Sequence, residues 1–196
     1  MNRFRFFHIA AYIIALMLNA CAHPITINPS STPVRVEEQL YSKKVVGYVM
    51  TEADRTIQVT TEGGGGDKAS YFPYKDLEKG IRDALRSLYS DVVSLHSPSD
   101  FGAIQRDQIA FVFAPEIHTS SSSDGLFTWM PTHFSVDLSF TVTDQAGTIL
   151  SRVRAVGQGV APFSENQHDF GLAGRRAAQN VLEKFVFEVR ANPRLR

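Results

Sequence analysis

The sequence predicts an α+β fold, a two-layer sandwich in which two main helices cover one face of a mostly antiparallel sheet. Three observations support this prediction. Residues 133–143 alternate between apolar and polar side chains without a break, the residues after Pro73 follow a helical period, and a second helical pattern runs from about 170 to 191. Along the chain the patterns follow the order strand, strand, helix, four strands, helix, which is typical of an antiparallel or mixed sheet.

The first half of the domain begins with two predicted strands. Segments 44–51 and 56–62 are rich in β-branched and aromatic residues, and we expect a connection at 53–55. The four glycines at 63–66 follow. Because glycine loses the most backbone entropy on folding and packs no side chain, this run predicts a loop.

An amphipathic helix of about four turns is predicted after Pro73. Its apolar residues recur on one face: Leu77, Ile81, Leu85 and Leu88. A short buried strand follows at 91–95. The segment 97–108 contains Pro98 and Gly102, so we expect an irregular connection with at most one helical turn.

The second half is richer in strands. Segment 109–119 is a predicted strand in which Pro115 indicates a bulge or an edge. The alternating segment 133–143 is a half-buried antiparallel strand, joined by a hairpin turn at 144–147 to a partner strand at 149–160. The last helix ends before Pro193 and is expected to lie on the sheet.

The N-terminus resembles a bacterial lipoprotein signal. Arg3 and Arg5 precede an apolar stretch, 6–18, which is too short for a confident membrane span, and Ala20-Cys21 supplies the small-residue cleavage junction. Asn19 departs from the residues usual at its position. The alternatives are an ordinary secretory signal with an incidental cysteine, or an uncleaved anchor helix.

Lipidation of Cys21 predicts attachment to a membrane without a transmembrane helix. Each buried methylene contributes about 0.8 kcal/mol, and two or three acyl chains anchor a domain stably. Ala22 stands where an aspartate would resemble an inner-membrane retention signal, so we expect the outer membrane and its periplasmic face.

Three regions follow from this reasoning. Residues 1–20 form a signal peptide, residues 21–35 form the lipidated N-terminus with a tether rich in proline and serine, and residues 36–196 form a single α+β domain. Within the tether, Ile25 and Ile27 flank Thr26, so a short edge strand is the alternative.

Charge and cysteine content exclude some classes. The whole chain has a formal net charge of zero, and removal of Arg3 and Arg5 with the signal makes it slightly negative. Nucleic acid is therefore not an expected partner. The chain has one cysteine, so a lipidated Cys21 leaves none for a disulfide or a nucleophilic thiolate.

Two loops are candidates for binding a protein partner. The glycine loop fails the phosphate-loop pattern because Asp67 precedes Lys68, and no cofactor is expected. Bare backbone amides can still dock a partner. An aromatic segment lies between two predicted strands, and its large side chains suit recognition, although closing the end of the core is an equal alternative for Phe127 and Trp129. The candidate residues are Gly64, Gly65, Asp67, Lys68, Phe127, Trp129 and Met130.

A catalytic or metal site is not expected. His118, Asp124, His133 and the serines at 120–123 contain the parts of a hydrolytic triad, but no nucleophile-elbow motif frames a serine. Metal binding by His118, His133 and Glu116 lacks the spacing of a known motif.

The whole layout resembles small envelope lipoproteins that are broadly YajG-like. The features that carry the resemblance are Cys21 with its preceding residues, the proline-rich segment, the glycine run leading into the segment Tyr71–Leu77, and the segment Phe127–Thr132. The resemblance implies a periplasm-facing domain tethered to the outer membrane. We expect a non-enzymatic accessory protein that binds another envelope component. The alternatives are a small-ligand or cell-wall binding module with a groove between helix and sheet, and a hydrolase around His118.

Overall fold

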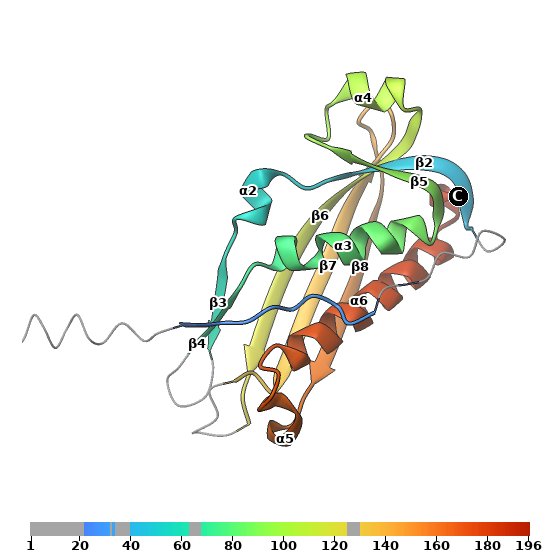
Figure 1. The fold of residues 1–196 in the computed structure, drawn as a ribbon. Helices are drawn as coiled ribbons and strands as arrows, with labels where there is room; N and C mark the ends of the chain where they lie inside the picture. The colour runs from blue at the N-terminus through green and yellow to red at the C-terminus, as the bar shows by residue number, and fades with distance from the viewer. Residues whose placement is uncertain (1–21, 32, 34–39, 63–67, 125–129) are drawn as a thin grey trace, which may run out of the picture.

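The computed structural model describes residues 22–31, 33, 40–62, 68–124 and 130–196, and these form the predicted α+β two-layer sandwich (Figure 1). The larger sheet has five strands in the order β5-β2-β6-β7-β8. They are β2 (Ser42–Val49), β5 (Tyr89–Leu95), β6 (Ile109–Ser122), β7 (His133–Thr143) and β8 (Ile149–Val160). A smaller sheet has the order β1-β4-β3, with β1 (Ala22–Pro24), β3 (Val59–Glu62) and β4 (Lys68–Tyr71).

The pairing in the larger sheet is mixed. β6, β7 and β8 form two long antiparallel ladders, which contain most of the paired residues. β2 lies parallel to both of its neighbours, β5 and β6. Parallel neighbours require a crossover connection, and the chain supplies it between β2 and β5.

Two long helices lie on one face of this sheet, as predicted: α3 (Pro73–Arg86) and α6 (Leu172–Ala191) (Figure 1). Between α6 and the sheet, the rings of Phe140 and Phe185 lie 4.5 Å apart between centroids, and Phe113 meets each of them edge-on. Such tilted and edge-on pairs add to the stability gained by burying the rings. The other helices of the described residues are short: α2 (Glu52–Arg55), α4 (Phe101–Arg106), α5 (Phe163–Asn166) and the 3-10 turn η3 (Pro193–Leu195).

Close packing of α6 on β8 depends on two strand glycines. A Cβ at Gly157 would overlap the carbonyl oxygen of Ala177, and one at Gly159 would overlap that of Ala173. The helix backbone therefore rests directly on the strand backbone. Side chains at these two positions would hold the helix away from the sheet.

Several local predictions are refined. The connection at 53–55 is α2, whose N-terminus is closed by a capping box between Thr51 and Asp54. Pro115 lies beyond Phe113, the last residue of β6 that pairs with β2, so it faces one neighbouring strand only, as an edge proline would. The β7–β8 hairpin turns at Gly147, where φ is +81°.

The segment we call the strap, residues 22–29, differs from the predicted tether. Its first residues form β1, which pairs with β4, and the amide of Ile25 donates a hydrogen bond of 2.9 Å to the carbonyl of Ser70. Ile25 and Ile27 are 8% and 0% exposed, whereas Thr26 between them is exposed. The strap is therefore part of the folded domain, and the alternation noted at Ile25 and Ile27 is the signal that identifies it.

Small residues on the two long helices make room for the strap. The added Cβ of an alanine at Gly80 of α3 would come within 2.9 Å of Pro29 Cγ, and one at Gly174 of α6 would overlap Ile27. These contacts come from helices more than 40 residues away along the chain. A proline- and serine-rich composition does not reveal them, which is why the segment had the pattern of a linker.

Candidate functional site

The outer face of β6, β7 and β8 is polar. Both long helices lie on the opposite face, and along β7 the residues alternate between buried apolar and half-buried polar side chains. We call this surface the polar face. Its residues are Ser120 and Ser122 of β6, Ser135, Asp137, Ser139 and Thr141 of β7, and Arg152, Arg154 and Gln158 of β8.

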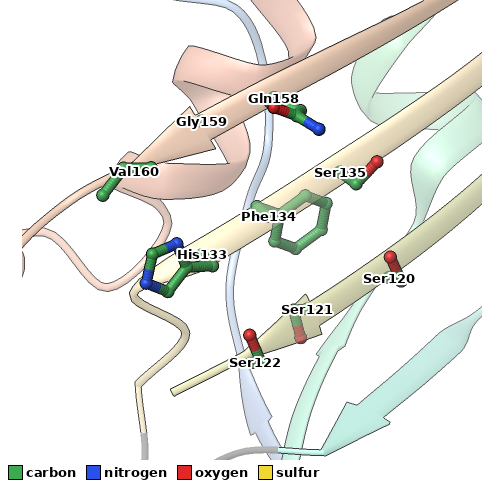
Figure 2. Close-up of a pocket in the computed structure, with 9 residues that line it drawn as sticks. All are labelled: Ser120, Ser121, Ser122, His133, Phe134, Ser135, Gln158, Gly159 and Val160. Carbon is green, nitrogen blue, oxygen red and sulfur yellow. The ribbon is translucent and has the colours of Figure 1, made fainter. Parts of the chain in front are cut away.

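A hollow of about 380 Å³ lies at one end of the polar face (Figure 2). Register places Ser122, His133 and Val160 side by side on three adjacent strands. The next row holds Ser120, Ser135 and Gln158. Hydroxyl, imidazole and amide groups therefore line the hollow, and such groups can hydrogen-bond to a polar partner.

His133 is held by an acidic neighbour. Its Nε2 lies 2.7 Å from Oδ1 of Asp124, and the two side chains are 47% and 66% exposed. The neighbouring serine hydroxyls donate elsewhere: Ser121 to Thr61 Oγ1 at 2.6 Å, and Ser123 to the carbonyl of Met130 at 2.7 Å. These two hydroxyls are thus not aligned with the imidazole as a nucleophile would be.

His118 lies farther along β6, away from Asp124. Its Nε2 contacts Oε1 of Glu116 at 3.0 Å, and both side chains are largely exposed. The grouping of His118 with Asp124, on which the hydrolase alternative depended, is not formed. Asp124 pairs with His133 instead, because the β6–β7 register brings the start of β7 to the end of β6.

The middle of the polar face carries a cross-strand ion pair. Arg154 of β8 donates to both carboxylate oxygens of Asp137 of β7, at 2.9 and 2.5 Å. These hydrogen bonds lower the pKa of Asp137 below its ordinary value. A second hollow of about 280 Å³ lies beside this pair, lined in part by Glu116, Ser139 and Arg152. The face carries charges of both signs and offers no one-sided field to attract a polyanion.

Metal-binding geometry is not found in the part of the chain that the structure describes, because no three His, Cys, Asp or Glu side chains come together there. The described helices also include none that is both long and apolar enough to cross a membrane.

The predicted partner-binding residues fall mostly outside the described residues: Gly64, Gly65, Asp67, Phe127 and Trp129, together with the lipidation site Cys21. Met130 is described and is only 5% exposed, so it contributes to the interior and offers no contact surface. Lys68 is half-buried at the start of β4, where it pairs with Ala22.

The described residues near the two candidate loops lie at one end of the sandwich: Lys68 follows the glycine loop, and Ser122 and His133 lie on the strands before and after the aromatic segment. Their strand partners Ala22 and Val160 lie beside them, and we call these five residues the rim. The smaller sheet joins the larger one at this end through the Thr61–Ser121 hydrogen bond. In Figure 1, β3, β4 and the tips of β6, β7 and β8 lie toward the same end of the molecule. The prediction from sequence missed the rim because it depends on the registers of both sheets.

The comparisons with known proteins support the fold only. No protein-family model matches the sequence, and no curated protein matches it. The crystal structure of protein XCC0632 from Xanthomonas campestris, of the family DUF330, is similar with a TM-score of 0.50 and 10% sequence identity. The alignment covers 87% of this chain and 94% of that one. At this identity the likeness extends to the fold, and the lipoprotein signal and the YajG-like resemblance stay predictions.

Proposed function

We propose that this protein is a non-enzymatic accessory lipoprotein, anchored through Cys21 to the outer membrane on its periplasmic face, that binds another component of the cell envelope. The observation that carries the proposal is the arrangement of basic residues, apolar stretch and Ala20-Cys21 at the N-terminus. It is supported by a folded domain that begins at Ala22, directly after the predicted lipid site.

The surface that best suits a partner is the polar face. Both long helices pack on the other side of the sheet, so the outward side chains of three long strands stay accessible over a broad area. Its paired charges and hydroxyl groups are typical of a hydrated protein–protein interface and not of an apolar interface.

The anchor is tested by replacing Cys21 with Ser. We expect the variant to leave the membrane fraction, and mass spectrometry of the wild-type protein to show a cleaved, lipidated N-terminus. An intact leader or a bare thiol at Cys21 would contradict the proposal.

The partner is sought by crosslinking in intact cells from a photoreactive residue. Suitable positions are Ser139 on the polar face and Trp129 of the aromatic segment. Phe187, which is 69% exposed on α6, is the control position on the other layer. We expect a specific adduct from Ser139 or Trp129; recovery of one from Phe187 alone, or of none, would count against this surface.

A second candidate is a binding module for a small polar ligand or a cell-wall fragment. The hollow beside His133 and Ser122 favours it, although this hollow lies on the outer face and not between helix and sheet as expected. Titration with soluble cell-wall fragments, followed by the NMR shifts of Ser120, Ser122 and His133, distinguishes this function from protein binding.

A further inference from the structure

The strap fixes the distance between the predicted lipid and the folded domain. Ala22 pairs with Lys68, and Cys21 is its direct neighbour in the chain. Consecutive Cα atoms are about 3.8 Å apart, so the lipidated residue is held within one residue of the sheet. A flexible tether would allow the domain to tumble above the bilayer, but this connection has no such slack.

Detaching the strap from the domain would cost free energy. Detaching it would expose Ile25 and Ile27, each of which contributes about 1.5–3 kcal/mol by burial. It would also break the 3.0 Å hydrogen bond from the amide of Ile27 to Asp76. The attachment is therefore strong enough to keep the folded domain next to its predicted lipid.

We propose that the rim faces the bilayer and contacts the lipid headgroups, so that the domain stands in a fixed orientation with the β7–β8 hairpin pointing into the periplasm. This inference rests on the lipid anchor of the proposed function. β7 has 11 residues, so its far end is about 35 Å from the rim. The hollow at Ser122 and His133 then opens beside the headgroups, and the middle of the polar face stands clear of them.

The chemistry of the rim suits a membrane surface. Ser122 carries an exposed hydroxyl that can hydrogen-bond to headgroups, and the exposed His133–Asp124 pair beside it is polar as well. Val160 and Phe163 at the same end are 51% and 54% exposed and can enter the apolar boundary of the headgroup layer. Exposed apolar residues also occur elsewhere, so their exposure alone does not show which end faces the bilayer. The position of Ala22, next to the predicted lipid, indicates that it is this end.

The orientation can be measured with a fluorophore on a single introduced cysteine, because the sulfur of a lipidated Cys21 does not react with a thiol label. Ser122→Cys places the label at the rim, and Ala146→Cys places it in the far hairpin; both positions are exposed. The lipidated proteins are reconstituted in vesicles that contain a quencher on the lipid headgroups. We expect several-fold stronger quenching at position 122 than at 146.

A spacer variant separates the orientation from the anchor. An insertion of about 12 Gly and Ser residues between Cys21 and Ala22 adds about 20 Å of flexible chain. We expect it to keep the protein in the membrane fraction and to abolish the difference between the two labels. Equal quenching at 122 and 146 without the insertion would overturn the inference while the anchor stands. Absence of lipid from the purified protein would overturn the proposed function, and the inference with it.

Discussion

The backbone amide of Ile27 donates a hydrogen bond of 3.0 Å to Oδ2 of Asp76, which joins the strap to the first turn of α3. Asp76 is only 8% exposed. Burial raises the pKa of its carboxyl group, an effect opposed by the Ile27 hydrogen bond and by the charge of Lys75. The strap is thus hydrogen-bonded to a buried carboxylate, and ionisation of this carboxylate lowers the free energy of unfolding.

Replacing Asp76 with Asn should flatten part of the pH dependence of stability. The folded pKa of Asp76 is raised, so its contribution is complete below the unfolded pKa near 3.8 and is lost as pH rises through the folded pKa. The free energy of unfolding of the wild type relative to Asp76→Asn should therefore fall as the pH rises above the unfolded pKa and through the raised folded pKa. Urea unfolding at several pH values measures this difference.

Asp76→Ala serves as the comparison for this prediction. Asparagine keeps an oxygen that can accept from the Ile27 amide, whereas alanine leaves that buried donor without it. We expect Asp76→Ala to be about 1–3 kcal/mol less stable than Asp76→Asn. A wild-type advantage over Asp76→Asn that stays constant, or grows, with rising pH would contradict the raised pKa.

Glu78, two residues along the same helix, should show the opposite pH dependence. Arg55 donates to both of its carboxylate oxygens, at 2.8 and 2.6 Å, and these bonds lower the pKa of Glu78. Its contribution is present above the unfolded pKa near 4.5 and is lost as pH falls through the folded pKa. Glu78→Gln should cost about 1 kcal/mol at pH 7 and progressively less in acid.

The same urea series tests Glu78, with Glu52→Gln as its control. Glu52 also contacts Arg55, at 2.6 Å, but its side chain is 89% exposed, so we expect a smaller effect. If Glu78→Gln loses as much stability at pH 3 as at pH 7, the Arg55 pair is not the source of the lowered pKa.

The strap should contribute to global stability if it belongs to the core. Ile27→Ala removes a fully buried side chain between α3 and α6 and should cost about 2–4 kcal/mol. Thr26→Ala, one residue away, changes an exposed side chain and should alter stability by less than about 0.5 kcal/mol. Chemical denaturation measures the free energy of unfolding of both variants. A large loss for Ile27→Ala alone supports the strap, and small, equal effects of both variants would indicate a free tether.

The sequence predicted elements best where one face of a strand or helix is buried. β7 was predicted with both ends correct, because the apolar–polar alternation runs through every residue of 133–143. The polar face is the other half of the same alternation. The parallel pairing of β2 was harder to predict from the sequence. It depends on the path of the crossover connection between β2 and β5, and the local residue pattern does not reveal that path.

Features that depend on contacts between distant segments were missed. The strap is recognised only when Gly80 and Gly174 are placed beside Pro29 and Ile27. The Asp124–His133 pair requires the β6–β7 register, which the sequence pattern did not supply, and the hydrolase alternative was placed around His118 instead. Both cases involve tertiary contacts that override local composition, as at many interaction sites.

The close packing of α6 on β8 gives a further large predicted effect. Gly157→Ala would place a Cβ against the carbonyl oxygen of Ala177 and the backbone of Val181, and neither can rotate away. The helix must lift from β8, which should cost about 3 kcal/mol. Gly102→Ala is the matched control, because the nearest atom to its new Cβ is Asp100 Oδ1 at 3.9 Å and the residue lies in α4. Since alanine favours helix, Gly102→Ala should be neutral or stabilise by up to about 1 kcal/mol. In thermal and urea unfolding, Gly157→Ala should thus lower stability and Gly102→Ala should not, and a Gly157→Ala protein as stable as the wild type would mean that α6 is not in backbone contact with β8.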